Sequence, residues 1–106
     1  MFVAVNHLIV KPGHGAEVER RFAARSGVER QPGFVRFELW RLRKQADHEE
    51  YLVVTHWESE EAHADWVQSE AFRRAHAGGR PDFFLDSHLS FYDVRLTSGP
   101  AAPASS

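Results

Sequence analysis

The chain has 106 residues, a formal net charge of −2 and no cysteine. Its length fits a single domain, and the missing cysteines exclude disulfides, thiolate metal sites and a cysteine nucleophile. The net charge argues against a nucleic-acid partner, because it provides no basic surface. The first ten residues, MFVAVNHLIV, contain no basic leader or cleavage site, and no segment is apolar enough to cross a membrane. We therefore expect a cytoplasmic protein without a membrane partner.

The first predicted element is a strand over residues 2–10. Its alternate side chains are apolar on both faces, except at Asn6 and His7. A strand of this kind is usually covered on both sides. The prediction is therefore a sheet with one layer packed against each face.

Helical and extended patterns then alternate along the chain. A helix is predicted over residues 15–30, where apolar residues recur near one face, and Pro32 and Gly33 end it. Strands are predicted over 34–42 and 50–58, where polar and apolar residues alternate or β-branched and aromatic residues gather. The polar segment KQADHE between these strands is predicted to be a hairpin loop.

Two short helices and a last strand complete the pattern. Ser59 and Ser69 are good N-cap residues, so a helix is predicted after each, with Trp66 on the inner face of the first. The last strand is predicted over 87–96. The Pro/Ala/Ser-rich segment 98–106 is predicted to be a disordered tail.

The order strand, helix, strand, strand, helices, strand predicts an α+β fold, the ferredoxin-like sandwich, within a single domain over residues 1–97. In this fold the helices cover one face of an antiparallel sheet. In a single copy the other face of the sheet would be exposed to water, although the first two strands carry apolar side chains on both faces. We therefore expect a homodimer.

Three residues are unusual for their positions. His76 follows Phe72 by four residues, so its imidazole lies on the same helix face as an aromatic ring. The alanines beside it and the glycine pair after it leave room for a flat ligand with a central metal, such as heme. Asn6 lies in an apolar strand, where its amide needs a partner in the backbone or in a ligand. Taken singly, His76 reads as a helix-end histidine and Trp66 as a core residue.

Four segments, NHLIVKPGHGAEVERRF, PGFVRFELWR, YLVVTHWESEEAHADWVQSEAFRRAH and FYDV, resemble the compact heme-degrading monooxygenases of the antibiotic-biosynthesis-monooxygenase (ABM) superfamily. The resemblance covers residues 2–95. It implies a ferredoxin-like homodimer whose sheets pack into a β-barrel, with one heme per subunit. It also implies that His76 binds the iron, that Asn6 lies on the opposite, distal face, and that Trp66 presses on the porphyrin.

The function implied is that of a heme oxygenase, which opens the porphyrin ring with O2 and electrons from an external reductase and releases iron. Heme is then both substrate and cofactor. Phe22 is interpreted as a wall of the heme pocket or as core, and Arg25 either contacts a heme propionate or lies at the pocket rim. Two alternatives stay open: a non-catalytic heme carrier or buffer, and a cofactor-free ABM monooxygenase acting on a quinol or polyketide.

Overall fold

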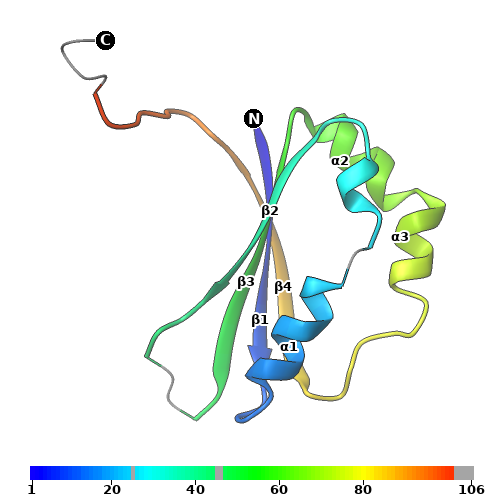
Figure 1. Cartoon of the computed structure of the whole chain (residues 1–106), viewed down its shortest axis with the longest axis vertical. Coiled ribbons are helices and arrows are strands. Elements are labelled where there is room, and N and C mark those ends of the chain that lie inside the picture. The colour runs from blue at the N-terminus through cyan, green and yellow to red at the C-terminus, as the bar shows by residue number, and fades with distance from the viewer. Residues whose placement is uncertain (25, 45–46, 102–106) are drawn as a thin grey trace.

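A four-stranded antiparallel sheet forms the centre of the molecule (Figure 1). The computed structural model describes residues 1–24, 26–44 and 47–101. The strand order across the sheet is β2-β3-β1-β4. The strand bounds are β1 (Phe2–Val10), β2 (Phe34–Arg41), β3 (Glu49–Trp57) and β4 (Phe84–Asp93). This order places β1, the first predicted strand, between two hydrogen-bonded neighbours.

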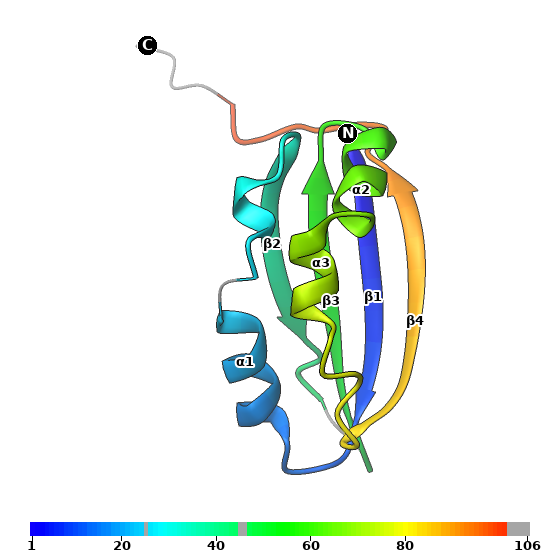
Figure 2. The same ribbon diagram turned by 90° about the vertical axis from the view of Figure 1, so that its right-hand side faces the viewer.

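The helices lie together on one face of the sheet (Figures 1 and 2). They are α1 (Gly15–Ala23), the 3-10 helix η1 (Val28–Arg30), α2 (Glu60–Val67) and α3 (Glu70–Ala75). Ser59 and Ser69 cap α2 and α3, because their Oγ atoms accept hydrogen bonds from the backbone N–H groups three residues later at 3.1 Å. The predicted α+β ferredoxin-like fold is thus confirmed, together with both predicted helix starts. None of the described helices is long and apolar enough to span a membrane.

Three predicted boundaries are wrong by more than one residue. The helix predicted over 15–30 ends at Ala23, and the chain resumes as the short 3-10 helix only after Gly27, whose φ of +94° is incompatible with a continuous α-helix. The strand predicted over 87–96 instead begins at Phe84 and ends at Asp93. Phe84 is 7% exposed and pairs with Val10 of β1, so burial of its ring fixes the start of the strand.

The strands predicted over 34–42 and 50–58 are confirmed to within one residue. The side chains of β2, however, do not simply alternate between the two faces of the sheet. The pairing of β2 with β3 is irregular between Phe34 and Arg36. Phe34 packs edge-on against Trp57, which also contacts the helix layer, and Phe37 stacks on Phe22 of α1. The bulge therefore turns both phenylalanines to the helix face, although they differ in parity.

The helix-facing core consists of two clusters that lie along β1. One cluster contains Phe2, Trp57 and Trp66 and packs against α2 and α3. The other includes Leu8 and Val10, together with residues of α1, β3 and β4. Along the helix-facing side of β1, Asn6 lies between these clusters, with Val53 and Leu89 as its neighbours in the adjacent strands.

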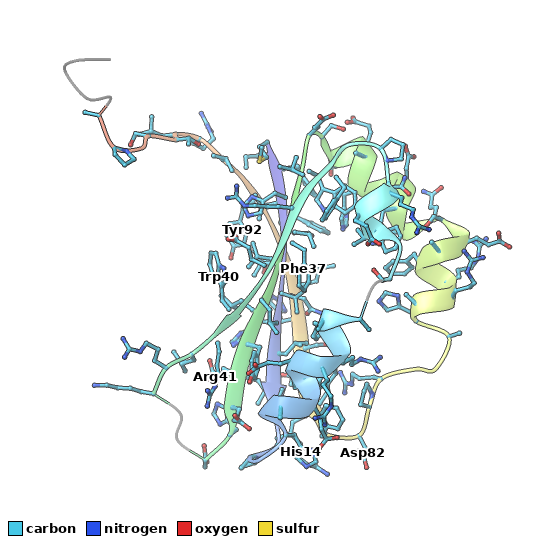
Figure 3. The ribbon with its side chains drawn as sticks, in the orientation of Figure 1. His14, Phe37, Trp40, Arg41, Asp82 and Tyr92 are labelled. Carbon is cyan, nitrogen blue, oxygen red and sulfur yellow. The ribbon has the colours of Figure 1, made fainter. Side chains whose placement is uncertain are left out.

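The opposite face of the sheet, here called the outer face, is not covered by any described helix. Trp40 and Tyr92 project from it, away from Phe37 and the helices (Figure 3), and are 50% and 57% exposed. After β4, residues 94–101 contain no helix or strand and are exposed. The predicted disordered tail falls largely on residues 102–106, outside the described residues, so the tail and the domain boundary at residue 97 stay predictions.

Candidate functional site

His76 is the C-cap residue of α3, and two contacts from Phe72 orient its imidazole. The two rings stack with centroids 4.0 Å apart and an interplanar angle of 24°. The Nδ1 atom lies 2.8 Å from the backbone carbonyl oxygen of Phe72. A carbonyl oxygen can only accept, so Nδ1 carries the proton in this contact. In the neutral ring, the Nε2 lone pair is then available to a metal.

The surroundings of His76 are open. His76 and the alanines on either side of it are exposed. A Cβ atom added at Gly78 or Gly79 would meet nothing within 4 Å, so there is free space beside the backbone that follows the imidazole. A neutral imidazole with an available Nε2 and an open flank is the donor arrangement that a heme iron needs on its proximal side. The residues present therefore fit the heme group that the sequence predicts.

Trp66 belongs to the same side-chain assembly as His76. Its indole is 7% exposed and packs with Phe2 and Trp57. The ring of Phe72 meets the indole edge-on, with centroids 5.6 Å apart and an interplanar angle of 88°. Phe72 therefore contacts both Trp66 and His76, and the predicted position of Trp66 on the inner helix face is confirmed.

Asn6 reaches the helix-facing side of the sheet from β1 and is half-buried. Among the described residues no side-chain hydrogen bond from its amide is formed, whereas the neighbouring Thr55 hydroxyl donates to the carbonyl oxygen of Ala4 at 3.4 Å. Leu89, opposite Asn6 in β4, is 52% exposed. An amide with two unpaired donors thus adjoins an exposed apolar surface, which is an arrangement suited to a flat, mostly apolar ligand.

The structure does not join every predicted site residue through direct contacts. Phe22 packs in the second core cluster and stacks on Phe37 and Phe84, at 6.2 and 6.5 Å between ring centroids. Its role as core is therefore evident, and its role as pocket wall stays a prediction. Arg25 lies outside the described residues, so its contact with a propionate also stays a prediction.

Arg21 was not predicted to contact the segment after His76, yet it links this segment to α1. Its Nη2 donates to the carbonyl oxygen of Gly79 at 3.5 Å, and its guanidinium lies 6.0 Å from the centroid of the Phe84 ring. The distance in sequence between Arg21 and Gly79 explains why no local pattern could reveal the contact.

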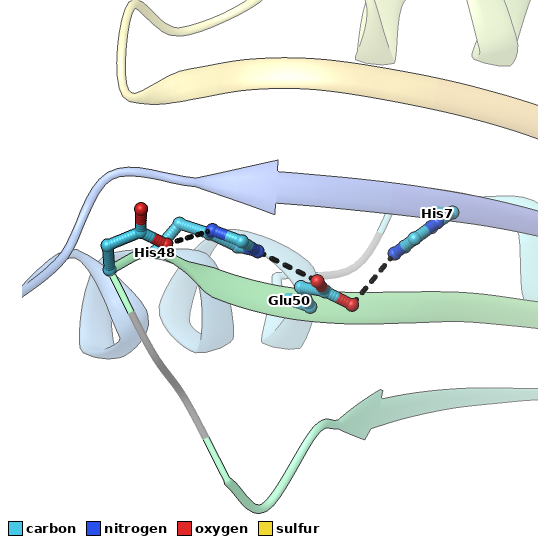
Figure 4. A network of polar contacts seen from close by, with 4 residues as sticks. His7, His48 and Glu50 are labelled. Atoms are coloured by element: carbon cyan, nitrogen blue, oxygen red, sulfur yellow. Dashed lines mark hydrogen bonds and ion pairs between the residues drawn. The ribbon is translucent and has the colours of Figure 1, made fainter.

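Several of the other histidines have carboxylate partners. His7 and His48 both bond to Glu50, at 3.2 and 2.7 Å, and His48 also bonds to Asp47 (Figure 4). The bonds to Glu50 and then to Asp47 raise the pKa of His48, and the bonds from His48 and His7 lower the pKa of Glu50. No group of three metal-binding side chains that could hold a metal ion occurs in the part of the chain that the structure describes.

His63 lies on α2, and its ring packs among aromatic side chains of the sheet. Its ring contacts three aromatic residues, with centroids 5.4 to 5.6 Å away, and these are Phe2, Trp57 and Phe91. Burial among these rings lowers the pKa of His63, because the charged imidazolium loses its water, and nearby Glu60 opposes the change only in part.

Acidification is therefore expected to destabilise the fold through His63. In the unfolded chain His63 takes up a proton at its ordinary pKa of 6.5, whereas the folded state resists protonation to a lower pH. Above pH 6.5, His63 should not affect the free energy of unfolding. Below pH 6.5, the free energy of unfolding should fall as the pH drops. Urea titrations at a series of pH values will measure the slope.

The variant His63→Gln should flatten that slope, and His88→Gln, at an exposed position of β4, should keep it. A slope that is identical in wild type and His63→Gln would contradict the assignment.

The comparisons with known proteins agree with this architecture. The family model described as antibiotic biosynthesis monooxygenase matches residues 1–78. The heme-degrading monooxygenase of Bacillus thuringiensis (strain Al Hakam) is 34% identical over 106 residues, which cover 98% of this chain and 99% of that protein. The chain belongs to the antibiotic biosynthesis monooxygenase family. The resemblance to the heme-degrading monooxygenases of that family is confirmed as well.

Two solved structures represent different chemistries on this fold. One is the heme-degrader MhuD from Mycobacterium tuberculosis, solved with two hemes bound in its active site, which is 40% identical to this chain. The match covers 93% of this chain and 100% of that one, with a TM-score of 0.74. A mutant of SnoaB, a cofactor-independent oxygenase from Streptomyces nogalater, is 26% identical; the match covers 91% of this chain and 94% of that one, with a TM-score of 0.70. The fold thus serves both kinds of oxygenase, and the site residues must discriminate between them.

Proposed function

We propose that this protein is a heme oxygenase in which His76 binds the heme iron and the porphyrin ring is opened with O2 and electrons from an external reductase, releasing iron. The observation that carries the proposal is the bond from His76 Nδ1 to the carbonyl oxygen of Phe72 at 2.8 Å. This bond turns Nε2 outward as the free ligand nitrogen. The 34% identity to a heme-degrading monooxygenase over nearly the whole chain supports the same assignment.

The apolar surface beside Asn6 supports a heme-sized ligand. Leu89 and Phe91 lie on the helix-facing side of β4, yet both are 52% exposed. Figure 2 shows β4 at the edge of the sheet that the helices leave uncovered. Contact with a porphyrin would bury these side chains, each worth about 1.5–3 kcal/mol when fully removed from water.

His76, Asn6 and Trp66 would each have a separate role in this reaction. Bound heme would supply the redox chemistry that activates O2, and His76 would hold it through Nε2. The Asn6 amide would donate hydrogen bonds to the reacting oxygen and stabilise negative charge that develops on it. Trp66, which is packed rigidly against Phe2 and Trp57, would press on the porphyrin.

An aerobic heme titration followed by reduction tests the proposed function. We expect a saturable complex with a sharpened Soret band, and loss of that band after ascorbate is added in the presence of catalase, with a bilin-type product in the mass spectrum. A complex whose Soret band survives reduction would identify a non-catalytic heme carrier. No complex at all would favour a cofactor-free oxygenase acting on a quinol or polyketide.

We also propose that the working unit is a homodimer in which the outer faces of two sheets pack into a β-barrel. Trp40 and Tyr92 are more than one-third exposed on that face, and the apolar side chains of β1 and β3 lie between them in the strand order. Exposed aromatic residues on an uncovered sheet face are typical of protein–protein interfaces. We also propose a cytoplasmic location for the protein and an external reductase as its source of electrons.

Replacing Trp40 by glutamate should dissociate this dimer. A carboxylate buried in an apolar interface costs several kcal/mol, so the dimer dissociation constant should rise by more than about 100-fold. Sedimentation equilibrium will measure the change. Val67→Glu, at a 40% exposed position on α2, should leave the dimer intact. Wild-type protein that sediments as a monomer, or a Trp40→Glu variant that sediments as a dimer, would refute the predicted interface.

A further inference from the structure

We propose that Phe72 is a positioning residue, which presets the direction of the His76 imidazole and ties it to Trp66. This inference rests on the proposed heme function, because it concerns the same site. Phe72 itself has no predicted contact with the iron and acts only through the histidine.

Two different parts of Phe72 hold the same imidazole. Its ring stacks on His76 at 4.0 Å between centroids, which restricts the tilt of the imidazole plane. Its carbonyl oxygen lies 2.8 Å from Nδ1, which selects the tautomer with Nε2 unprotonated. The same carbonyl oxygen also accepts the backbone N–H of His76 at 3.1 Å, so the main chain and the side chain of His76 share one anchor.

Phe72 is itself fixed by the helix layer. Its backbone N–H donates to the Ser69 Oγ at 3.1 Å, in the cap of α3. Its ring meets the Trp66 indole edge-on and packs against the cluster of Phe2, Trp57 and Trp66. His76, in contrast, is exposed and lies beyond the last residue of α3. The packed phenylalanine therefore restrains the exposed histidine.

This arrangement has a consequence for heme binding. An exposed histidine normally populates several rotamers and loses that freedom when it binds a metal. Stacking on Phe72 removes much of this cost before heme arrives, so affinity is gained through preorganisation. Because Phe72 also contacts Trp66, one ring sets the position of the iron ligand relative to the indole that would press on the porphyrin.

Three variants separate this role from simple core packing. Phe72→Leu keeps apolar bulk and the backbone carbonyl group but removes the flat ring. Phe72→Tyr keeps the ring and should restore wild-type behaviour. Phe34→Leu is the matched control, since Phe34 is also partly buried against the same core cluster, but its ring meets Trp57.

The first measurement uses the heme-free protein. Nitrogen-15 NMR of the neutral His76 ring should show Nδ1 protonated in the wild type. Without the stacked ring the imidazole should leave the carbonyl oxygen of residue 72 part of the time, so we expect Phe72→Leu to give a mixture of tautomers. Phe72→Tyr and Phe34→Leu should give the wild-type signals. Equal disturbance by Phe72→Leu and Phe34→Leu, or no disturbance by Phe72→Leu, would overturn the inference.

The second measurement uses the heme complex. Phe72→Leu should weaken heme binding by roughly 10-fold, the lower end of the effect of removing a residue that orients a metal ligand, and should shift the iron–histidine stretching band of the ferrous complex. Unchanged affinity and an unchanged band would overturn the positioning role. If the wild-type complex lacks an iron–histidine band, the proposed function fails instead, while the heme-free spectra still decide whether Phe72 orients His76.

Discussion

Replacement of His76 by alanine is expected to abolish axial coordination of the heme iron. The affinity for heme should fall by more than the ~10- to 100-fold that the loss of an outer-shell partner costs, because here the ligand nitrogen itself is removed. The Soret band should shift to the position of weakly bound heme, and ring opening should stop. Absorbance titration and product analysis by mass spectrometry will measure both effects.

Two comparisons isolate the role of the imidazole. Added imidazole should restore much of the lost ligation in His76→Ala, because the free space beside Gly78 and Gly79 admits a small ligand. His88→Ala removes a histidine on the outer face of β4, on the side of the sheet opposite Asn6, and the variant should bind heme like the wild type once sedimentation shows that it is still a dimer. A His76→Ala protein that keeps the wild-type Soret band and turnover would show that another group holds the iron.

Replacement of Asn6 by alanine is expected to separate binding from chemistry. Heme affinity should stay close to that of the wild type, since the iron ligand and the apolar contacts remain. The rate of ring opening should fall about 100-fold, the effect typical of removing one preorganised hydrogen-bond donor to a developing negative charge. Single-turnover kinetics after reduction, followed at the Soret band, will measure the rate directly.

The adjacent residue provides the control for Asn6. His7 follows it on β1 but points to the outer face, where it bonds to Glu50 at 3.2 Å. His7→Ala should therefore leave the rate of ring opening unchanged. If Asn6→Ala opens heme at the wild-type rate, the distal role of the amide is wrong, even if His76 binds the iron.

The strands and helix starts could be predicted because their signals are local. Alternation over residues 2–10 gives the same bounds as β1, and Ser59 and Ser69 mark their helices by short-range capping. The end of α1 was missed because the apolar spacing continues to Val28, and only the left-handed Gly27 reveals the break. The start of β4 was missed because it depends on burial of Phe84 against β1, which is a long-range contact.

In the candidate site, too, features with a local sequence signal were predictable and features that depend on long-range contacts were not. Phe72 and His76 lie four residues apart on one short helix, so their shared face was predictable, and the stacking distance of 4.0 Å agrees with it. The burial of His63 depends on Phe2 and Phe91 from distant strands, and its position within the sequence of α2 does not reveal these contacts. Residues that meet only through tertiary packing leave no local pattern for sequence reasoning to use.

A crystal structure of the protein bound to heme tests the central claim most directly. We predict that Nε2 of His76 coordinates the iron, that Nδ1 keeps its bond to the Phe72 carbonyl oxygen, and that the Asn6 amide faces the opposite side of the porphyrin. An iron atom held by any other group, with the His76 ring turned to solvent, would contradict this prediction.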